Sequence, residues 1–402
     1  MITEGLINVA VLFGGDSVEH EVSIISAVQA INNFNTDKYN IIPVYLAKDG
    51  KMYTSASMMK IESFKDMETL FKSAKEIRFF KENNSVFIKS EKKNDFSGKK
   101  PLKIDVALPV VHGTNCEDGT LQGYLEMLKL PYAGCDVLAS AVGMDKAVFK
   151  SVLKTAGIPV LDCIRFSSRE FIEFEKSIIS KINSSVGYPL IVKPVNLGSS
   201  VGISKVNSEA DLKSALEKAF SFSEYVLVER AVQNLREINC SVLGDAAECT
   251  ASECEEPVMT DEILSYSDKY FNSSNSKGMS SLKRKLPADI PTDVSDSIKE
   301  FACRTFKAIN AHGVARIDFL MDNESKEVFV NEINTIPGSL SFYLWEASGI
   351  KYPELLDKLI SLAFKRNRQR EKLSFEIETN ILSQCGSFGA KGSKGGKFGG
   401  KF

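Results

Sequence analysis

The stretch of sequence from residue 316 to residue 338 reads Arg-Ile-Asp-Phe-Leu-Met-Asp-Asn-Glu-Ser-Lys-Glu-Val-Phe-Val-Asn-Glu-Ile-Asn-Thr-Ile-Pro-Gly. Two apolar-rich runs flank a polar segment centred on Ser325, and this pattern predicts a β-hairpin. Folding the chain about Ser325 makes one face apolar apart from Asn331, whereas a slip of one residue would scramble that face. The opposed pairs on the apolar face are then Ile317 with Ile333 and Met321 with Phe329.

The other face of the predicted hairpin carries charged residues. The same register places Asp318 opposite Glu332 and Arg316 opposite Asn334, with roughly 4.5–5.5 Å between opposed Cβ atoms. Two facing carboxylates repel each other unless a cation lies between them, and oxygen ligands of this kind suit Mg²⁺ together with substrate phosphates. An arginine beside such a site can offset charge that develops on a transferred group. The hairpin therefore predicts a platform for a metal ion and a phosphate; the alternative is an exposed face with ordinary charges.

Length and composition indicate a globular protein of two or three domains. The 402 residues are 43% hydrophobic and 25% charged, and the net charge is −2 at pH 7, which argues against bulk nucleic-acid binding. No apolar run approaches the roughly 20 residues that span a bilayer, and the start of the chain carries no secretory signal pattern. The eight cysteines include no CxxC pair, as expected for reduced thiols in the cytoplasm.

The N-terminal part of the sequence predicts a doubly wound α/β domain. The apolar run 7–13 is typical of a buried parallel strand, and a glycine turn and a helical pattern follow it. Residues 41–46 and 104–111 predict further strands of the same sheet. The Lys-rich segment 50–103 has weak periodicity, and we expect an insertion of mixed structure there.

The remainder of the sequence predicts helices and strands in alternation. Residues 259–288 have no clear period and are expected to form a long surface loop, as active-site lids do. The segment from Gly386 combines Gly, Lys and Phe without an acidic residue. It predicts a disordered tail, with contact to RNA or to an acidic partner as the less favoured alternative. The expected helices are 136–158, 211–220, 292–311 and 352–370, and the expected strands are 188–194, 203–206 and 225–229.

Two polar loops follow strands in the N-terminal half. Glu19 and His20 lie in the run 17–23 at the start of the first helix, where capping and the helix dipole also account for acidic residues. His112 opens a Gly-rich loop, 112–123, that leads from a strand into a helix, the usual position of a ligand site in an open α/β sheet. The alternative there is a tight connection with an Asp or Thr cap.

Lysines and small residues in the middle of the chain indicate phosphate binding. Lys193 ends a strand, and its flexible point charge suits a nucleotide phosphate; Lys146 is a second candidate. The loop that contains Ser199 and Ser200 has glycines at both ends, and its backbone N–H groups could cover phosphates. Taken alone, each lysine is better explained as a surface charge.

In their order along the chain, these motifs resemble the D-alanine–D-alanine ligase family of ATP-grasp enzymes. The resemblance runs from about residue 7 to residue 365 and leaves out the 50–103 segment and the tail. Each motif is modest, but the ordered set is highly specific. Besides the hairpin, the motifs are Val-Leu-Phe-Gly-Gly-Asp-Ser-Val-Glu-His-Glu-Val-Ser from Val11, His-Gly-Thr-Asn-Cys-Glu-Asp-Gly-Thr-Leu-Gln-Gly from His112, Pro-Tyr-Ala-Gly-Cys from Pro131, Met-Asp-Lys from Met144, and Val-Lys-Pro from Val192 with Gly-Ser-Ser-Val-Gly from Gly198.

The resemblance implies an N-terminal doubly wound parallel-sheet domain, 1–136, followed by two α+β ATP-grasp domains, 137–230 and 231–372, and the tail, 373–402. ATP would be gripped between the two ATP-grasp domains. Asp318, Glu332 and Asn334 would hold two Mg²⁺ ions, or Mn²⁺ in their place. The implied ATP contacts are Lys146 and Lys193 at the phosphates, Glu229 at the adenine amino group, Glu237 at the ribose, and Ser200 and Lys269.

The resemblance also implies an amino-acid site and a reaction. Glu19 would bind the ammonium group of a first D-alanine, beside a hydrogen-bonded cluster of Ser199 and Tyr270. Arg316 and the backbone of Gly338 would stabilise the tetrahedral intermediate. The further implied substrate contacts are His112, Tyr343 and Leu344. The implied activity joins two D-alanines through a D-alanyl phosphate, with ATP, for peptidoglycan precursor synthesis in the cytoplasm.

The sequence departs from the family pattern where the second substrate would be held. The family usually has a small hydroxyl residue where Tyr343 stands, and residues 263–266, before Lys269 and Tyr270, also differ. Two alternatives therefore stay open: a ligase with D-serine, another amino acid or a peptide as second substrate, and a non-catalytic nucleotide-binding relative. The implied partners are ATP, D-amino acids and a second copy in a homodimer; nucleic acid and membrane are not expected partners.

Overall fold

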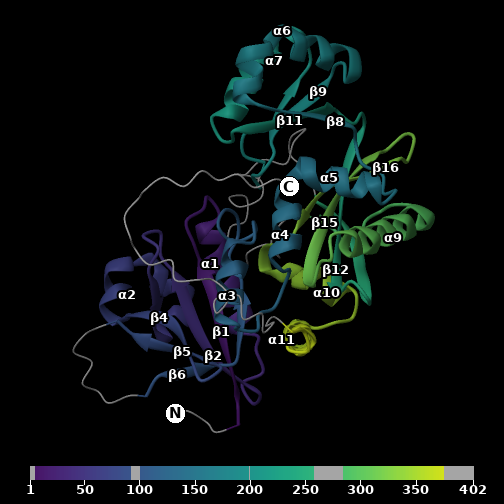
Figure 1. The fold of residues 1–402 in the computed structure, drawn as a ribbon. Helices are drawn as coiled ribbons and strands as arrows, with labels where there is room; N and C mark the ends of the chain where they lie inside the picture. The colour runs from purple at the N-terminus through teal and green to yellow at the C-terminus, as the bar shows by residue number, and fades with distance from the viewer. Residues whose placement is uncertain (1–4, 92–99, 199, 258–283, 375–402) are drawn as a thin grey trace, which may run out of the picture.

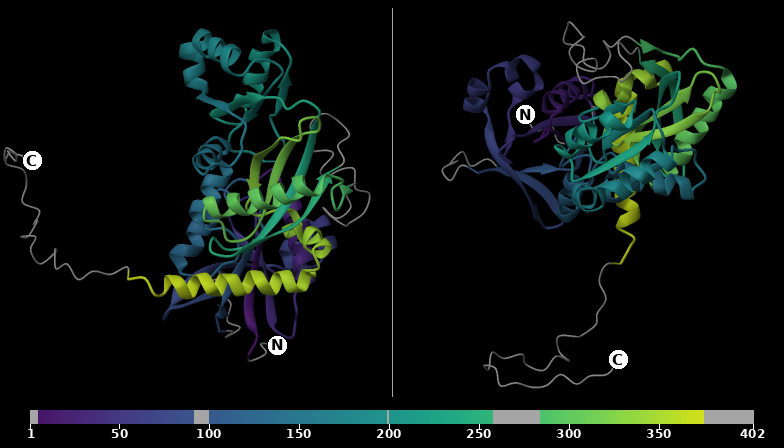
Figure 2. Two further views of the ribbon diagram at one scale, coloured as in Figure 1. Left: turned by 90° about the vertical axis from the view of Figure 1, so that its right-hand side faces the viewer. Right: turned by 90° about the horizontal axis from the view of Figure 1, so that it is seen from above.

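The computed structural model describes residues 5–91, 100–198, 200–257 and 284–374. Within these ranges the chain forms three β-sheets in sequence order, each flanked by helices (Figures 1 and 2). The architecture is α/β, as the sequence predicted. No helix in the described part of the chain is both long and apolar enough to cross a membrane.

The N-terminal sheet has a parallel core and an antiparallel extension. Its strands are β1 (Ile7–Gly14), β2 (Tyr39–Leu46), β3 (Met52–Thr54), β4 (Lys75–Glu82), β5 (Ser85–Ser90), β6 (Leu102–Ile104) and β7 (Val106–Pro109). β1 runs parallel to both β2 and β7, which confirms the expected parallel strands. The predicted insertion supplies β3 to β6, which extend the sheet antiparallel from β2. The single strand expected over 104–111 is divided at Asp105, whose carboxylate accepts the Asn8 N–H at 2.9 Å.

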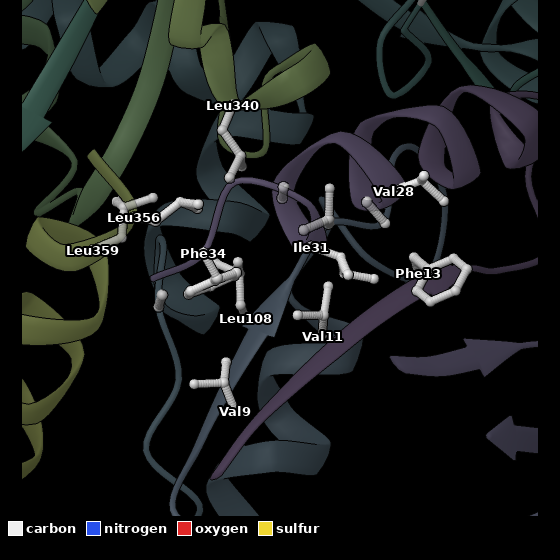
Figure 3. Close-up of a cluster of buried hydrophobic side chains, with 14 of the residues drawn as sticks. Val9, Val11, Phe13, Val28, Ile31, Phe34, Leu108, Leu340, Leu356 and Leu359 are labelled. Atoms are coloured by element: carbon white, nitrogen blue, oxygen red, sulfur yellow. The ribbon is translucent and has the colours of Figure 1, made fainter. Parts of the chain in front are cut away.

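The end of the chain packs on this N-terminal sheet. The last helix, α11 (Tyr352–Arg370), has the predicted bounds. Its Leu356 and Leu359 share a core with Val9 of β1 and with Leu340, which lies in the turn after the hairpin (Figure 3). Each fully buried leucine contributes on the order of 1.5–3 kcal/mol, so this core fixes the third sheet against the first. The other elements around it are α1 (His20–Ile31), η1 (Ala56–Met59), η2 (Ile61–Lys65), α2 (Met67–Ser73), η4 (Gly338–Ser341) and α10 (Phe342–Ala347). Helix α3 (Thr120–Leu128) packs on a separate core of the same sheet, with Leu12 of β1 and Leu125 of its own.

The second sheet is small and antiparallel, with strand order β10-β9-β11-β8. It lies at the top of Figure 1 under α6 and α7. The three strands that the sequence predicted here are present, and the first of them begins two residues later than expected, after Pro189. The elements are β8 (Cys163–Ser167), α6 (Ser168–Ser185), β9 (Leu190–Pro194), β10 (Ser204–Val206), α7 (Glu209–Phe220) and β11 (Tyr225–Arg230).

The single helix expected over 136–158 is wrong. The structure has two helices, α4 (Val137–Met144) and α5 (Lys146–Thr155), separated at Asp145. The Asp145 carboxylate accepts the N–H groups of Ala147 and Val148 at 3.0 Å each, as a strong N-cap does. A new helix therefore starts at Lys146. Both helices pack on the third sheet, and the division of the chain at residues 136 and 230 stays a prediction.

The third sheet has one apolar and one polar face. Its strands are β12 (Leu235–Gly244), β13 (Cys249–Pro257), β14 (Arg284–Lys285), β15 (Gly313–Asp322) and β16 (Val328–Asn334), in the order β14-β13-β12-β15-β16. Alternate residues of β12 and β15, among them Ile238, Ile317 and Phe319, are buried under α9 (Thr292–Ala308). Because successive side chains on a strand point to opposite faces, the residues between them form the polar face.

The predicted hairpin is present, and three of its four predicted residue pairs are confirmed, including Arg316 with Asn334. Ile317 pairs with Ile333 and Asp318 with Glu332, as expected, but Met321 pairs with Val328 instead of Phe329. The cause is a β-bulge: Glu332 and Val330 are opposite successive residues of β15, so Asn331 is extra. The bulge removes Asn331 from the apolar face, where the simple register had placed it.

Candidate active site

A row of acidic and amide side chains crosses four strands on the polar face of the third sheet. Glu255 on β13 lies opposite Asn239 on β12, which lies opposite Asp318 on β15. Asp318 in turn lies opposite Glu332 on β16. Arg316 and Asn334 occupy the next row of the same face, because they stand two residues away on their strands. The sheet thus gathers on one surface the four hairpin residues that the sequence singled out.

Arg316 is a fixed cation at the centre of this surface. Its Nε and Nη2 donate to the two carboxylate oxygens of Asp318 at 2.6 and 2.8 Å, and Asn334 Nδ2 donates to the same carboxylate at 2.9 Å. Burial opposes the charged guanidinium, but the Asp318 carboxylate raises the pKa of Arg316 well above its usual value. A two-pronged pair of this kind fixes orientation as well as charge. The Arg316 guanidinium is therefore already held in place, and it can bind an anion without losing further side-chain freedom.

The donor set around Asp318 fits Mg²⁺. Asp318 and Glu332 offer carboxylate oxygens, and Asn334 keeps its amide oxygen for a ligand because its Nδ2 is bonded to Asp318. Hard oxygen donors on a few protein side chains suit Mg²⁺, with further oxygens from water or phosphate. Within the described ranges, no three His, Cys, Asp or Glu side chains form a metal cage on their own. The residues thus fit a metal ion that shares its ligands with a substrate.

Lys146 connects the hairpin with the loop that follows β9. As the first residue of α5, it is buried, and its ammonium group donates to the Leu197 carbonyl at 2.7 Å. The same Nζ lies 3.1 Å from Glu332 Oε2. This cation stands beside the implied metal ligands, where a phosphate would also need it.

Lys193 and Glu229 form part of a buried charge cluster on the second sheet. Lys193 Nζ lies 2.5 Å from Glu229 Oε1 and donates to Asn331 Oδ1, the bulge residue, at 2.9 Å. Lys150 Nζ lies 2.6 Å from the other oxygen of Glu229. Burial alone would raise the pKa of Glu229, but the two ammonium groups lower it to about 2. Glu229 is therefore charged at neutral pH although it is only 1% exposed.

A cavity of about 490 Å³ opens between the second and third sheets. This volume lies within the usual range for small-molecule sites. Lys193, Glu229 and Asn331 line it together with Glu237 and the segment 230–235, which joins the two sheets. Apolar walls come from Ile191, Ile203 and Leu320. The cavity thus has an apolar interior, with charges of both signs at defined places.

Glu19 lies where three loops meet. A Cβ atom built on Gly113 would stand 3.2 Å from Glu19 Oε2, and one built on Gly198 would stand 3.4 Å from the same oxygen. Gly113 also has φ +81°, which a residue with a side chain rarely adopts. The two glycines leave room for the buried Glu19 carboxylate, and they bring it close to the loop that contains Ser200, whose φ is +59°.

His112 and Glu117 join the N-terminal sheet to the segment after the hairpin. Both ring nitrogens of His112 have protein partners, the Ile336 carbonyl at 2.8 Å and Ser26 Oγ at 3.0 Å. The Glu117 carboxylate accepts the N–H groups of Gly113 at 2.9 Å and Ile336 at 3.2 Å. Burial lowers the pKa of His112, which favours the neutral ring. In this structure His112 holds two loops together, and its implied substrate contact stays a prediction.

The turn after Gly338 has an unusual backbone. Ser339, Leu340 and Ser341 have φ of 50°, 53° and 51°, so three successive residues with side chains are left-handed. This conformation costs roughly 1–2 kcal/mol per residue. The buried Leu340 side chain and the bond from Ser339 N–H to Ser26 Oγ, 2.9 Å, hold it in place. Strain maintained in this way is a common property of functional loops.

Tyr343 and Leu344 follow this turn in α10. Tyr343 donates to Glu255 Oε1 at 2.9 Å, and Arg284 donates to the other oxygen of Glu255 at 2.8 Å. The Arg284 guanidinium also stacks on the Tyr343 ring, 3.9 Å from its centre. Leu344 is fully buried. The Tyr343 hydroxyl is thus engaged at the Glu255 end of the polar row. Three other predicted site residues, Ser199, Lys269 and Tyr270, lie outside the described residues.

Sequence reasoning missed Lys150, Asn331 and Glu117 as site residues. Lys150 stands four residues after Lys146, and residues at this spacing share a helix face; this signal could have found it. Asn331 was the one polar residue on an apolar face, which is a sign of a bulge. Glu117 carried no local signal, because its partner Ile336 lies 219 residues away.

Comparison with known proteins identifies this arrangement. Models of the D-ala D-ala ligase N-terminus and C-terminus match residues 8–135 and 152–361. A D-alanine–D-alanine ligase of Thermosipho melanesiensis is 39% identical and covers 94% of this chain and 98% of its own length; one of Acetivibrio thermocellus is 41% identical over 89% and 96%.

Solved structures agree with these sequence matches. The D-alanine-D-alanine ligase of Coxiella burnetii superposes with a TM-score of 0.77 at 32% identity, over 94% of this chain and 99% of that one. The VanG D-Ala:D-Ser ligase of Enterococcus faecalis superposes with a TM-score of 0.74 at 31% identity, over 89% and 99%. The fold is the ATP-grasp fold expected from the resemblance. This chain belongs to the D-alanine–D-alanine ligase family.

Proposed function

We propose that this protein joins two D-alanines to D-alanyl-D-alanine with conversion of ATP to ADP and phosphate. The observation that carries this proposal is the polar face of the third sheet. It sets Asp318, Glu332 and Asn334 beside the fixed guanidinium of Arg316, and Glu332 in turn contacts Lys146. Family membership supplies the substrate class, since relatives at about 40% identity carry this name.

ATP would bind across the cavity between the second and third sheets. The adenosine part occupies the 490 Å³ cavity, with Glu229 at the adenine amino group and Glu237 at the ribose. Lys146 and Lys193 turn to the phosphates, together with the backbone of the Ser200 loop and Lys269. Asp318, Glu332 and Asn334 would hold Mg²⁺ or Mn²⁺. The metal, when bound, neutralises charge on the transferred phosphoryl group.

The reaction proceeds in two transfers. A carboxylate oxygen of the first D-alanine attacks the γ-phosphorus, and ADP leaves, so that an acyl phosphate forms. The amine of the second D-alanine, after losing a proton, attacks the acyl carbon, and phosphate leaves as the peptide bond forms. Arg316 faces the oxyanion of the tetrahedral intermediate, with the Gly338 backbone as a second donor.

Glu19 would hold the ammonium group of the first D-alanine. Its buried carboxylate lies beside the Gly113 and Gly198 backbones, and Ser199 and Tyr270 complete the cluster. Tyr343 and Leu344 would border the second substrate, with His112 at the first. We also propose that the enzyme works as a homodimer in the cytoplasm, where precursors of peptidoglycan are made.

A substrate panel tests the proposal. The purified chain is incubated with ATP, Mg²⁺ and single or paired amino acids, phosphate release is recorded, and the product is weighed by mass spectrometry. D-alanine should support phosphate release and give a dipeptide of two alanines. Phosphate release that is equally fast with L-alanine, or that needs no amino acid, would contradict the proposal. If D-alanine and D-serine are supplied in equal amounts and the product is D-alanyl-D-serine, the second substrate is D-serine instead of D-alanine.

A further inference from the structure

Lys150 is a buried cation that the proposed catalytic steps do not use. It lies one turn after Lys146 in α5, is 2% exposed, and donates to Glu229 Oε2 at 2.6 Å. Burial lowers its pKa, and the Glu229 charge opposes that shift. The lining of the nucleotide cavity includes Lys193 and Glu229 but not Lys150. Lys150 thus contacts Glu229 without itself lining the cavity.

The two lysines of the charge cluster differ in what they can do. Lys193 lines the cavity and has a second partner, Asn331, so its ammonium group can turn toward a phosphate. If it does, Glu229 loses one of its two cations. Lys150 is then the cation that stays, since its ammonium group is enclosed and faces the other carboxylate oxygen. A buried carboxylate left without a partner would be strongly disfavoured.

Helix α5 gives Lys150 a fixed place. Ala147 of this helix packs with Val195 and Leu227 of the second sheet, whereas Phe149 and Leu153 pack with the third sheet. Residues four apart share a helix face, so Lys146 and Lys150 point to the same side. One helix therefore carries both Lys146, at the phosphate end of the proposed site, and Lys150, the partner of Glu229, and it fixes their positions relative to each other.

We propose that Lys150 is a positioning residue for nucleotide recognition, which holds the Glu229 carboxylate toward the base when Lys193 turns to the phosphates. This inference rests on the proposed ATP site. It assigns to Lys150 an effect on nucleotide binding that acts through Glu229 alone. The proposed amino-acid subsites lie at Glu19 and along the polar face of the third sheet. Replacement of Lys150 should therefore leave amino-acid binding unchanged.

The test compares Lys150→Met with wild type. Binding of the non-hydrolysable analogue AMP-PNP with Mg²⁺ is measured by calorimetry, and KM for ATP, KM for D-alanine and kcat are measured separately. Loss of one charged hydrogen bond should weaken nucleotide binding and raise KM for ATP about tenfold or more, with KM for D-alanine unchanged. Lys154→Met is the matched control, because Lys154 lies one turn further on the same helix, with a side chain 70% exposed; it should match wild type.

A double variant separates positioning from general stability. The double variant Lys150→Met/Glu229→Gln lacks both the Lys150 charge and the Glu229 charge. If Lys150 acts through Glu229, the double variant should bind AMP-PNP with the same affinity as Glu229→Gln alone. This comparison also decides the matter if Lys150→Met alone does not fold. Additive losses in the double variant, unchanged AMP-PNP binding in Lys150→Met, or equal losses in both KM values would overturn the inference. Failure of the wild-type chain to bind AMP-PNP would instead overturn the proposed function and the inference with it.

Discussion

A buried carboxylate in the nucleotide cavity, Glu229, and a partly buried one at the joint between the first and third sheets, Glu117, differ in charge. Burial disfavours the ionised form of both. At Glu229 the ammonium groups of Lys150 and Lys193 reverse this effect and lower the pKa to about 2. At Glu117 burial and the nearby Glu19 carboxylate raise the pKa to about 8, and two backbone N–H groups do not offset them.

The difference shows how the chain builds two kinds of region. In the nucleotide cavity, buried lysines are paired with a buried carboxylate. Such pairing is expected where the phosphates of a bound nucleotide must take the place of that carboxylate beside one of the lysines. The joint around Glu117 and His112 uses neutral hydrogen bonds between loops that lie far apart in the sequence. Charges in the first region should therefore control nucleotide binding and catalysis, and Glu117 in the second should control stability.

The largest effect is expected for Glu332→Gln in the charged region. The carboxamide keeps the shape but removes the charge that faces Lys146 and Asp318. Turnover should fall at least about 100-fold, whereas circular dichroism and the unfolding temperature stay close to wild type. Activity retained at the wild-type level would remove Glu332 from the metal site.

Glu229→Gln should have the next largest effect. Loss of the charged bonds to Lys150 and Lys193 is expected to weaken ATP binding about tenfold or more, measured by calorimetry. Because the folded-state pKa of Glu229 is lowered, its stabilising contribution is present above the ordinary pKa near 4.5 and is lost as the pH falls toward 2. The wild type should therefore lose more stability than the variant between pH 5 and pH 2. Parallel melting curves over that range would contradict the charge assignment.

Glu117→Gln should change activity little near pH 7. A glutamine is uncharged, like the protonated carboxyl group, so kcat should move by about threefold or less, a change of about 0.6 kcal/mol. Its amide nitrogen cannot accept one of the two backbone N–H bonds, so the variant should be less stable. The free energy of unfolding should depend on pH differently in the variant and in the wild type. Because the pKa of Glu117 is raised in the folded state, folding retains a proton there, and wild-type stability falls as the pH rises from about 4.5 to about 8. Melting temperatures of the two proteins across that window should diverge; if they run in parallel, Glu117 is ionised in the fold.

Deletion of residues 386–402 tests a segment that lies outside the described residues. Residues 386–402 include no acidic residue and match neither family model. We expect kcat and both KM values to equal those of the full-length chain. A loss of more than about tenfold would show that the tail takes part in the site.

Hydrophobic periodicity predicted the elements and their faces. The alternation along 315–321 placed Ile317 and Phe319 inside and Asp318 on the opposite face, and the structure agrees. It could not reveal the bulge at Asn331, because period-2 counting assumes one residue per step on both strands. Nor did it place the break at Asp145, where a local side-chain cap competes with a continuous helical pattern.

The sequence by itself determined the hairpin, the pairing of Asp318 with Glu332, and the order of motifs that marks the family. These properties depend on residues that are close in the chain or joined by a short turn, so the local sequence pattern is enough to predict them. Only the tertiary structure decided which charges meet. Lys150 and Glu229 are 79 residues apart, and Glu117 and Ile336 are 219 apart. Their contacts, and the opposite pKa shifts of the two carboxylates, follow from how sheets and helices pack, because burial and distance between charges are not properties of any single segment.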